Sequence, residues 1–518
     1  MQQMLEFLKA SLREFLPMPK QINAYHDPFT HKFPPEISSM IFKHTMPDLW
    51  ETQQRDQWVS SSQRSAPLTL SAVSQRWRTI SQGTPKLWTD VHLNISLLYK
   101  IHYSSGSPIS EHNQVKLEIF RQWLSRAGIH PLSLHITMLP KYTEKLNAGG
   151  FARQIRREEI DREFGPFIEV INSHAHRWQN LSVRSVDAVL LSLGRSYEDA
   201  PRLRTLMLSS LDGRQGSDTE EYVADDSADR FSLTTGTPRP SKNIRMRACI
   251  KTLSFAPQVV ECRINHFFCS PRLITPEPIA HLSLKHLYVH DSALQGLNFM
   301  DEITLPALTH LSLRLGPLQL SDCHVLVDFV KRSSCILTNF ELSSYGFGKE
   351  HMDLLIYLLC CLPSIEYLVL RRMDFHPEDL LRLLAITAVI VNSDTASSDM
   401  VSDNDNEKEE RPSFLPKLQH FSYSLSIAQL QKETPWHLLP NVFGPLSGNN
   451  RRPLKSLKVD NEWRLDDDAQ IFLENAEEID EDVVRRLIDV VDAGFSLQLP
   501  VEMRKEDLMS ILGRLDIQ

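Results

Sequence analysis

The sequence of 518 residues predicts an α/β fold: a small all-α N-terminal unit followed by an irregular leucine-rich-repeat solenoid with one curved parallel sheet. Two observations lead to this prediction. An apolar motif recurs from about residue 175 onward, at the spacing of a strand and a helix. Short amphipathic segments rich in proline and tryptophan occupy residues 33–88, before the repeats begin.

The recurring motif has the pattern apolar-x-x-apolar-x-apolar, in which the last two apolar residues lie on one face of a short strand. Five of the eight gaps between successive motifs fall within 24–29 residues, the range of leucine-rich repeats, and gaps of 56 and 53 are about two periods. The central residues of the nine motifs are Leu181, Leu206, Cys262, Leu287, Leu311, Phe340, Leu368, Phe421 and Leu457.

Several stretches between the motifs have helical periodicity. Val325, Leu326, Phe329 and Val330 share one face, and so do Met352, Leu355, Ile356, Leu359 and Leu362. Because a single strand and helix cannot bury both of their faces, neighbouring units must stack. The alternative is an ordinary α/β domain with leucine-rich strands.

Two earlier segments extend the predicted sheet toward the N-terminus. Leu87–Ile95 and Pro131–Met138 alternate as strands do, and Val115–Ala127 between them has the pattern of a helix. We therefore expect the solenoid to begin near Trp88 and to occupy residues 88–500.

Residues 33–88 predict two amphipathic helices separated by a long polar loop. Pro34 and Pro35 suit a first helical turn, where a missing N–H is tolerated. The first apolar stripe is Ile37, Met40, Ile41 and His44. The second is Leu70, Val73, Trp77 and Ile80, which predicts one helix ending at Gly83 and Pro85. On pattern alone, these stripes would form the core of a small helical unit.

The ordered combination of residues resembles the F-box-like family that is expanded in fungi. Phe33-Pro34-Pro35-Glu36-Ile37 corresponds to the family's Leu-Pro-Pro-Glu-Ile, with Phe33 in place of the first leucine. The matching segments that follow are Ile41-Phe42, Pro67 to Leu70, Val73, Trp77-Arg78 and Thr84-Pro85-x-Leu87-Trp88, with Ser74 in place of the usual cysteine. The resemblance covers most of residues 33–500, with an F-box-like domain at 33–87.

The resemblance implies that the chain is the substrate-recognition subunit of an SCF-type cullin-RING ubiquitin ligase. Its helices would dock on the small Skp-family adaptor, and its solenoid would bind an unknown target protein. No catalysis is expected in this chain, because tethering alone raises the local concentration of the target. The family's adaptor-facing positions correspond to Pro34, Pro35, Glu36, Ile37, Ile41, Phe42, Leu70, Val73 and Trp77.

Composition limits the partners and the compartment. The net charge of −9 and the pI of about 6.1 argue against a nucleic-acid partner. Seven cysteines, none in the first 248 residues, are typical of a reducing compartment, the cytoplasm or the nucleus. Cys360-Cys361 lies in an apolar helical run and is expected in the core. The longest apolar stretch, Leu380–Val391, is too short to span a membrane.

The remaining segments are predicted to flank or interrupt the repeats. Residues 1–32 form an amphipathic helix, with Leu5, Leu8, Leu12 and Phe15 on one stripe, and a linker. Residues 213–242 and 392–412 are polar and are expected to be insertions without a packed core. Residues 501–518 form a tail or a cap.

The sequence lacks the common motifs of catalytic and cofactor sites. The sequence has no phosphate-binding glycine motif, no Gly-x-Ser-x-Gly and no Cys-x-x-Cys, so neither a cofactor nor a metal is predicted. His174-Ala-His176 would place two imidazoles on one face of a strand, and we interpret them as surface or capping residues. The acidic runs Asp466–Asp468 and Glu477-Glu478 lack the spacing of a calcium loop.

Three other functions fit the same sequence. The chain could be a leucine-rich-repeat scaffold or binding protein that acts outside a ubiquitin ligase. It could be an enzyme whose site is assembled across the repeats, which a buried pair of ionisable groups in a pocket would indicate. It could bind nucleic acid through a continuous basic stripe, against its net charge.

Overall fold

A computed structural model describes most of the predicted helices and strands, and the chain divides into two compact units, Met1–Leu211 and Asp212–Gln518. The described residues are 32–46, 65–98, 109–141, 157–185, 189–190, 193, 200–210, 253, 256–265, 278–291, 297–316, 320–344, 349–373, 378–388, 414–425, 435–446, 451–461 and 480–498. The predicted N-terminal helix, the loop after Met46, both polar insertions, both acidic runs and the C-terminal tail lie outside the described residues.

In the first unit, residues 32–46 and 65–88 form three short helices and a 3-10 turn. They are α4 (Pro35–Thr45), α7 (Ala66–Val73), α8 (Gln75–Gln82) and η1 (Pro85–Trp88). Helix α4 has Pro35 at its first position, where the fixed φ of proline suits a helix and no N–H is needed.

The prediction of a single helix through Leu70 and Ile80 is wrong, because the helix is interrupted at Ser74. The backbone of Ser74 is extended, with φ −151° and ψ 168°, and its hydroxyl accepts a hydrogen bond from the backbone N–H of Trp77 at 3.1 Å. Serine favours this capping position over a helix interior. The segment therefore forms α7 and α8 in succession.

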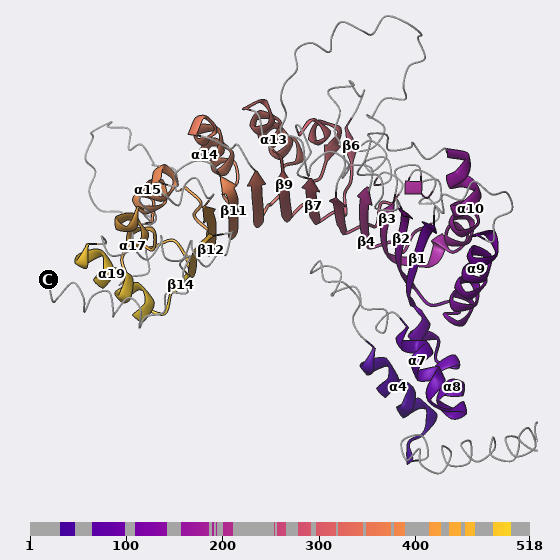
Figure 1. The fold of residues 1–518 in the computed structure, drawn as a ribbon. Coiled ribbons are helices and arrows are strands. Elements are labelled where there is room, and N and C mark those ends of the chain that lie inside the picture. The colour runs from indigo at the N-terminus through magenta and orange to yellow at the C-terminus, as the bar shows by residue number, and fades with distance from the viewer. Residues whose placement is uncertain are drawn as a thin grey trace, which may run out of the picture. The chain divides into compact units, whose positions relative to one another are not determined.

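Four parallel strands follow in the first unit, paired in chain order. They are β1 (Asp90–Leu98), β2 (Leu132–Lys141), β3 (Trp178–Ser185) and β4 (Thr205–Ser210). Helix α9 (Ile109–Arg126) connects the first two strands; α10 (Arg157–Ser173) and the 3-10 turn η3 (Ala175–Arg177) precede β3. Figure 1 shows α9 and α10 beside these strands. The two early strands and the helix between them confirm the sequence predictions.

The described residues of the second unit include eight parallel strands that are also paired in chain order. They are β5 (Glu261–Asn265), β7 (His286–Asp291), β9 (His310–Leu315), β10 (Asn339–Ser344), β11 (Tyr367–Met373), β12 (His420–Leu425), β13 (Ser456–Asn461) and β14 (Ser496–Gln498). A separate parallel pair is formed by β6 (Ile279–Ala280) and β8 (Ile303–Thr304). Among the described residues, the parallel strands of this kind therefore number four in the first unit and eight in the second.

Helices of the second unit lie between its strands in sequence. They are α13 (Leu320–Ser333), α14 (Met352–Cys360), α15 (Glu378–Ile386), α17 (Leu439–Val442) and α19 (Glu481–Asp492), with 3-10 turns η7 (Asn298–Glu302), η8 (Lys349–His351) and η10 (Trp436–Leu438). In Figure 1, α13, α14 and α15 lie along one side of the row of strands. The predicted faces of α13 and α14 are largely buried, as expected.

Each of the nine apolar motifs supplies one strand, and their register aligns the motifs. In the second unit, the central residues Cys262, Leu287, Leu311, Phe340, Leu368, Phe421 and Leu457 are partners on successive strands, and each is at most 2% exposed. The α/β class and the parallel sheet are thus confirmed. The assignment of these units to a leucine-rich-repeat solenoid stays a prediction.

The prediction that Cys360 lies in the core is wrong. Helix α14 buries Met352, Leu355, Leu358 and Leu359, whereas the side chain of Cys360 is exposed and that of Cys361 is half-buried. A helix turns about 100° per residue, so the position after Leu359 points away from the buried face. No helix among the described residues is long and apolar enough to cross a membrane.

Candidate functional site

Helix α4 exposes most of its predicted stripe: Ile37, Met40 and His44 are exposed, and Ile41 is half-buried. Phe33, just before the helix, is 41% exposed, Ile37 is 39% exposed and Met40 is 57% exposed. Ile37 and Met40 are three residues apart on α4, so they share one face of the helix, and Phe33 lies just before it. The stripe therefore faces solvent, and the interpretation of it as the core of the helical unit is wrong.

The opposite side of α4 is anchored to α8 and to the end of the helical segment. Phe42 is 1% exposed, and its ring centroid lies 4.7 Å from that of Trp77. The hydroxyls of Ser39 and Thr84 are hydrogen-bonded at 2.8 Å. Phe42 was predicted to face a partner, and this is corrected: its side chain is buried against Trp77 and packs α4 onto α8.

Helices α7 and α8 are held together by buried polar contacts. The hydroxyls of Ser71 and Ser81 are 2.6 Å apart, and Nε of Arg78 donates to the carbonyl oxygen of Ser71 at 2.9 Å. Because the helix is interrupted at Ser74, Val73 and Ile80 lie on different helices: Val73 is 49% exposed, whereas Ile80 is buried. The predicted common stripe of the second segment is therefore divided between solvent and core.

The nine residues predicted to contact a partner differ in exposure. The exposed residues are Pro34, Pro35, Glu36, Ile37 and Val73. Ile41, Leu70 and Trp77 are half-buried, and Phe42 is buried. Sequence reasoning left Phe33, Met40 and Leu68 out of this set, although all three are exposed and apolar. Met40 could have been included, because it is three residues from Ile37 and therefore lies on the same helix face. The sequence pattern gives no comparable reason to expect that Leu68 is exposed.

Trp88 connects the helical segment to the first strand. The side chain is fully buried, and its Nε1 donates to the carbonyl oxygen of Ser81 at 2.8 Å. In turn, Nε1 of Trp123 on α9 donates to the carbonyl oxygen of Trp88 at 3.0 Å, and the guanidinium of Arg126 lies 4.6 Å from the Trp88 ring centroid. The exposed stripe is thereby carried by a segment that is fixed to β1 and α9.

A second candidate surface is polar and lies on the strands of the second unit. Glu341 on β10 accepts a hydrogen bond from Ser312 at 2.9 Å and pairs with Arg314 at 3.1 Å and Arg371 at 3.4 Å. Although burial of the Glu341 carboxyl group opposes its ionisation, the two guanidinium groups and the Ser312 hydroxyl hold its pKa below the usual value. The Arg314 and Arg371 side chains are 44% and 41% exposed.

Aromatic and basic side chains continue this polar face on the neighbouring strands β5, β7 and β9. The guanidinium of Arg263 lies 4.2 Å from the ring centroid of Tyr288 and pairs with Glu261 at 2.7 Å. The rings of His286 and His310, on neighbouring strands, are 4.3 Å apart. These residues alternate with the buried motif positions, so they lie on the sheet face opposite the apolar core. Such a face suits recognition of a peptide or a protein surface.

Candidate reactive groups in the described residues have structural roles. Burial raises the pKa of the Cys262 thiol to about 12, which keeps it protonated and unreactive at neutral pH. His174 precedes a 3-10 turn and is not on a strand as predicted; its Nδ1 lies 3.0 Å from the carbonyl oxygen of Val170. It therefore caps α10, in agreement with the interpretation of this pair as surface or capping residues.

Comparison with known proteins adds no further constraint. No model of a known protein family matches this chain, and no curated protein shows significant sequence similarity to it. The function is therefore inferred from the residues themselves and from their geometry.

Proposed function

We propose that this chain is the substrate-recognition subunit of an SCF-type cullin-RING ubiquitin ligase. In this proposal the helices at residues 33–88 dock on the small Skp-family adaptor, and the strands and helices that follow bind a target protein. The observation that carries the proposal is the exposed apolar stripe of Phe33, Ile37 and Met40 beside the Pro34-Pro35-Glu36 motif.

An exposed stripe of this kind favours a protein partner. Three exposed apolar side chains on and just before one short helix are unfavourable in water, and burying each contributes about 1.5–3 kcal/mol. Contiguous apolar side chains with polar residues around them are typical of protein-interaction sites. An amphipathic helix that presents its apolar face is a common way to bind a groove or a facing helix.

Departures from the family pattern have physical explanations that are compatible with docking. Phe33 replaces leucine with a larger apolar side chain at the edge of the stripe. Ser74 replaces cysteine and caps α8. Phe42 supports α4 from its buried side, so we assign it to the stability of the stripe and not to the contact itself.

We assign target binding to the polar sheet face around Glu341. Two exposed guanidinium groups share one carboxylate there, which leaves one positive charge in excess. Arginines in this arrangement form strong, geometrically specific hydrogen bonds to carboxylate and phosphate groups. An acidic segment of a target protein is the partner chemistry that fits.

The chain would act by position and not by catalysis. A target held on the second unit would be kept near the ubiquitin-charged enzyme of the same assembly, and its lysines would react at a raised effective concentration. Affinity for the adaptor and affinity for the target are then separable properties of the two units.

Co-elution of the full chain with a Skp-family adaptor tests this proposal. The double variant Ile37→Asp, Met40→Asp should abolish co-elution, because its carboxylates would be buried without partners in the interface. Ile129→Asp is the matched control: Ile129 is an apolar residue of the same unit that is 86% exposed and lies outside the helical segment.

All three proteins should melt at similar temperatures, since the substituted side chains are exposed. Unchanged co-elution of the double variant would remove α4 from the adaptor interface. If the folded wild-type chain does not bind the adaptor at all, the proposal is wrong, and a repeat scaffold outside a ubiquitin ligase becomes the better account.

A further inference from the structure

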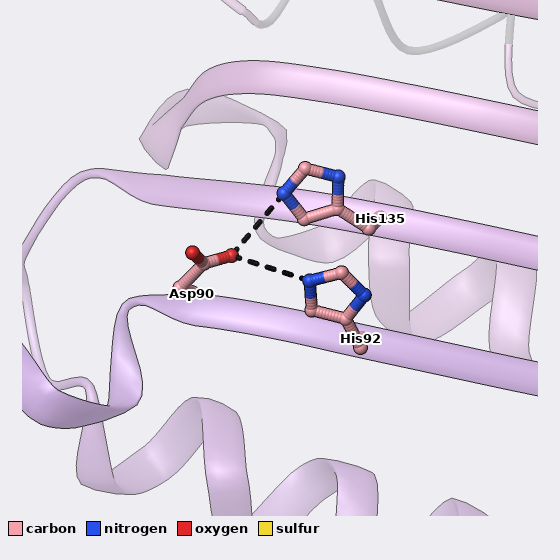
Figure 2. A group of neighbouring side chains, drawn as sticks. All are labelled: Asp90, His92 and His135. Carbon is pink, nitrogen blue, oxygen red and sulfur yellow. Dashed lines mark ion pairs between the residues drawn. The ribbon is translucent and has the colours of Figure 1, made fainter. Parts of the chain in front are cut away.

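Two histidines and one aspartate meet at the start of the sheet in the first unit. Asp90 and His92 are two residues apart on β1, so their side chains point to the same face. His135 on β2 is the direct register partner of His92. Figure 2 shows both imidazole rings directed toward the Asp90 carboxylate.

The donor atoms of the three side chains converge on one small region. Nε2 of His135 lies 3.2 Å from Oδ1 of Asp90, and Nε2 of His92 lies 3.8 Å from the same oxygen. One ligand atom from each residue falls within 4.8 Å of the others. The two rings are stacked, with centroids 4.3 Å apart and planes inclined by 13°.

The cluster is sheltered on one side and open on the other. The side chain of His135 is 2% exposed and that of His92 is 11% exposed, whereas Asp90 is 33% exposed. The imidazoles are thus largely shielded from solvent, and an ion from solvent has access past the carboxylate.

We propose that Asp90, His92 and His135 bind a divalent transition-metal ion, with Zn²⁺ as the best fit. Two imidazole nitrogens and one carboxylate oxygen form a common set of three zinc ligands, and a water molecule supplies the fourth. Zinc bonds of roughly 2.0–2.1 Å place neighbouring ligand atoms of a tetrahedron about 3.3 Å apart. The distance from Asp90 to His135 already matches this value.

Small rearrangements would complete the site. The separation of Asp90 from His92 must shorten by about 0.5 Å to reach the tetrahedral value, and the stacked rings must tilt so that both nitrogens point at the ion. His92 is the less buried of the two histidines and lies on the open side, so it is the ring that would move.

The consequence of binding would be structural. The ion would join β1 to β2 immediately after Trp88, where the helical segment meets the sheet. A ligand that binds only the folded state stabilises it by mass action. We therefore expect Zn²⁺ to raise the melting temperature of the chain, whether or not the chain binds an adaptor.

Metal titration of the full chain, prepared without a histidine tag and freed of metal with a chelator, tests the site. Zn²⁺ should bind by calorimetry and raise the melting temperature, and Co²⁺ should produce visible absorption of a tetrahedral complex. Asp90→Asn and His92→Gln, at the more exposed positions, should each weaken Zn²⁺ binding by at least about tenfold. His135→Gln, if the variant folds, should also weaken Zn²⁺ binding.

His176→Gln is the matched control, because His176 is an exposed histidine of the same unit outside the cluster. This variant should retain the Zn²⁺ affinity, the Co²⁺ spectrum and the melting shift of the wild type. The proposal is overturned if the wild type shows no Zn²⁺ binding. It is equally overturned if Asp90→Asn and His92→Gln bind Zn²⁺ as the wild type does, since the ion would then lie elsewhere.

Discussion

The indole nitrogen of Trp88 donates a hydrogen bond to the carbonyl oxygen of Ser81 at 2.8 Å, and this contact fastens α8 to the residues that lead into β1. Because Trp88 is fully buried, the contact is part of the core of the first unit and not a surface feature. The helical segment and the first strand are therefore expected to unfold together.

Substitution of Trp88 separates the role of its ring from that of its N–H group. Trp88→Phe keeps most of the buried apolar surface but removes one hydrogen bond to the Ser81 carbonyl oxygen, which still accepts from the backbone N–H of Thr84, for a cost of about 0.5–1.5 kcal/mol. Trp88→Ala should cost about 3–5 kcal/mol, because it also creates a cavity. Urea unfolding of the full chain measures both values, and equal stability of all three proteins would contradict the proposed junction.

Phe42 and Met40 should respond in opposite ways, although both are apolar residues of α4. Phe42→Ala removes a buried ring and should destabilise the helical segment by about 3 kcal/mol or more. Met40→Ala changes an exposed side chain and should leave stability within about 0.5 kcal/mol. Amide hydrogen exchange of α4 in the two variants distinguishes them, and faster exchange in Met40→Ala than in Phe42→Ala would reverse the assignment of the helix faces.

Arg452 is predicted to be a principal stabilising residue of the second unit. Its side chain is buried, and its guanidinium donates to the carbonyl oxygens of Leu384, Leu415 and Phe414 at 2.9, 3.1 and 2.7 Å. Arg452→Met removes every donor while keeping a long side chain. It should lower the free energy of unfolding by about 3 kcal/mol, since buried acceptors lose their partners.

The control for Arg452 is Arg382→Met on α15, whose exposed ion pair with Glu378 is worth no more than about 0.5 kcal/mol. Thermal or urea unfolding of the second unit provides the comparison. Similar losses in the two variants would show that burial and hydrogen bonding at Arg452 have been overestimated.

Glu341 should make stability depend on pH in the acidic range. Its pKa is lowered in the folded protein, so the ionised carboxylate stabilises the fold above the unfolded value of 4.5 and this contribution is lost as the pH falls further. Glu341→Gln should reduce stability at neutral pH by up to about 1 kcal/mol, because its arginine partners are well exposed.

The difference in stability between wild type and Glu341→Gln should be smaller in acidic solution, well below pH 4.5, than at neutral pH, because the lowered pKa of Glu341 is then passed and the carboxylate becomes protonated. Urea unfolding at the two pH values gives both differences. A difference that stays constant or grows at acidic pH would contradict the charge pairing at Glu341.

Strands were predictable from the sequence, whereas faces and contacts were not. The nine apolar motifs became strands because alternate side chains such as Leu311 and Leu313 must both be buried. The sequence did not determine which face of α4 is buried. Ser38 and Phe42 lie on one side of the helix and Ile37 and Met40 on another, and tertiary packing buries the side with Ser38 and Phe42.

Features that depend on capping or on register also escaped prediction. The apolar spacing on both sides of Ser74 is that of one continuous helix, so periodicity alone predicts no interruption. The helix is interrupted because Ser74 caps α8. The cluster of Asp90, His92 and His135 requires the pairing of β1 with β2, which brings together residues more than forty positions apart in the sequence. Asp90-x-His92 alone has no metal-binding spacing that separates it from ordinary strand residues.

Amide hydrogen exchange of the full chain, with and without a purified Skp-family adaptor, is the most direct test of the proposed function. Adaptor binding should slow exchange in Pro35–Thr45 and in Ala66–Val73, where Ile37, Met40 and Val73 are exposed, and should leave the strands of the second unit unchanged. Unchanged exchange in both helices at saturating adaptor, or protection confined to the second unit, would contradict the account.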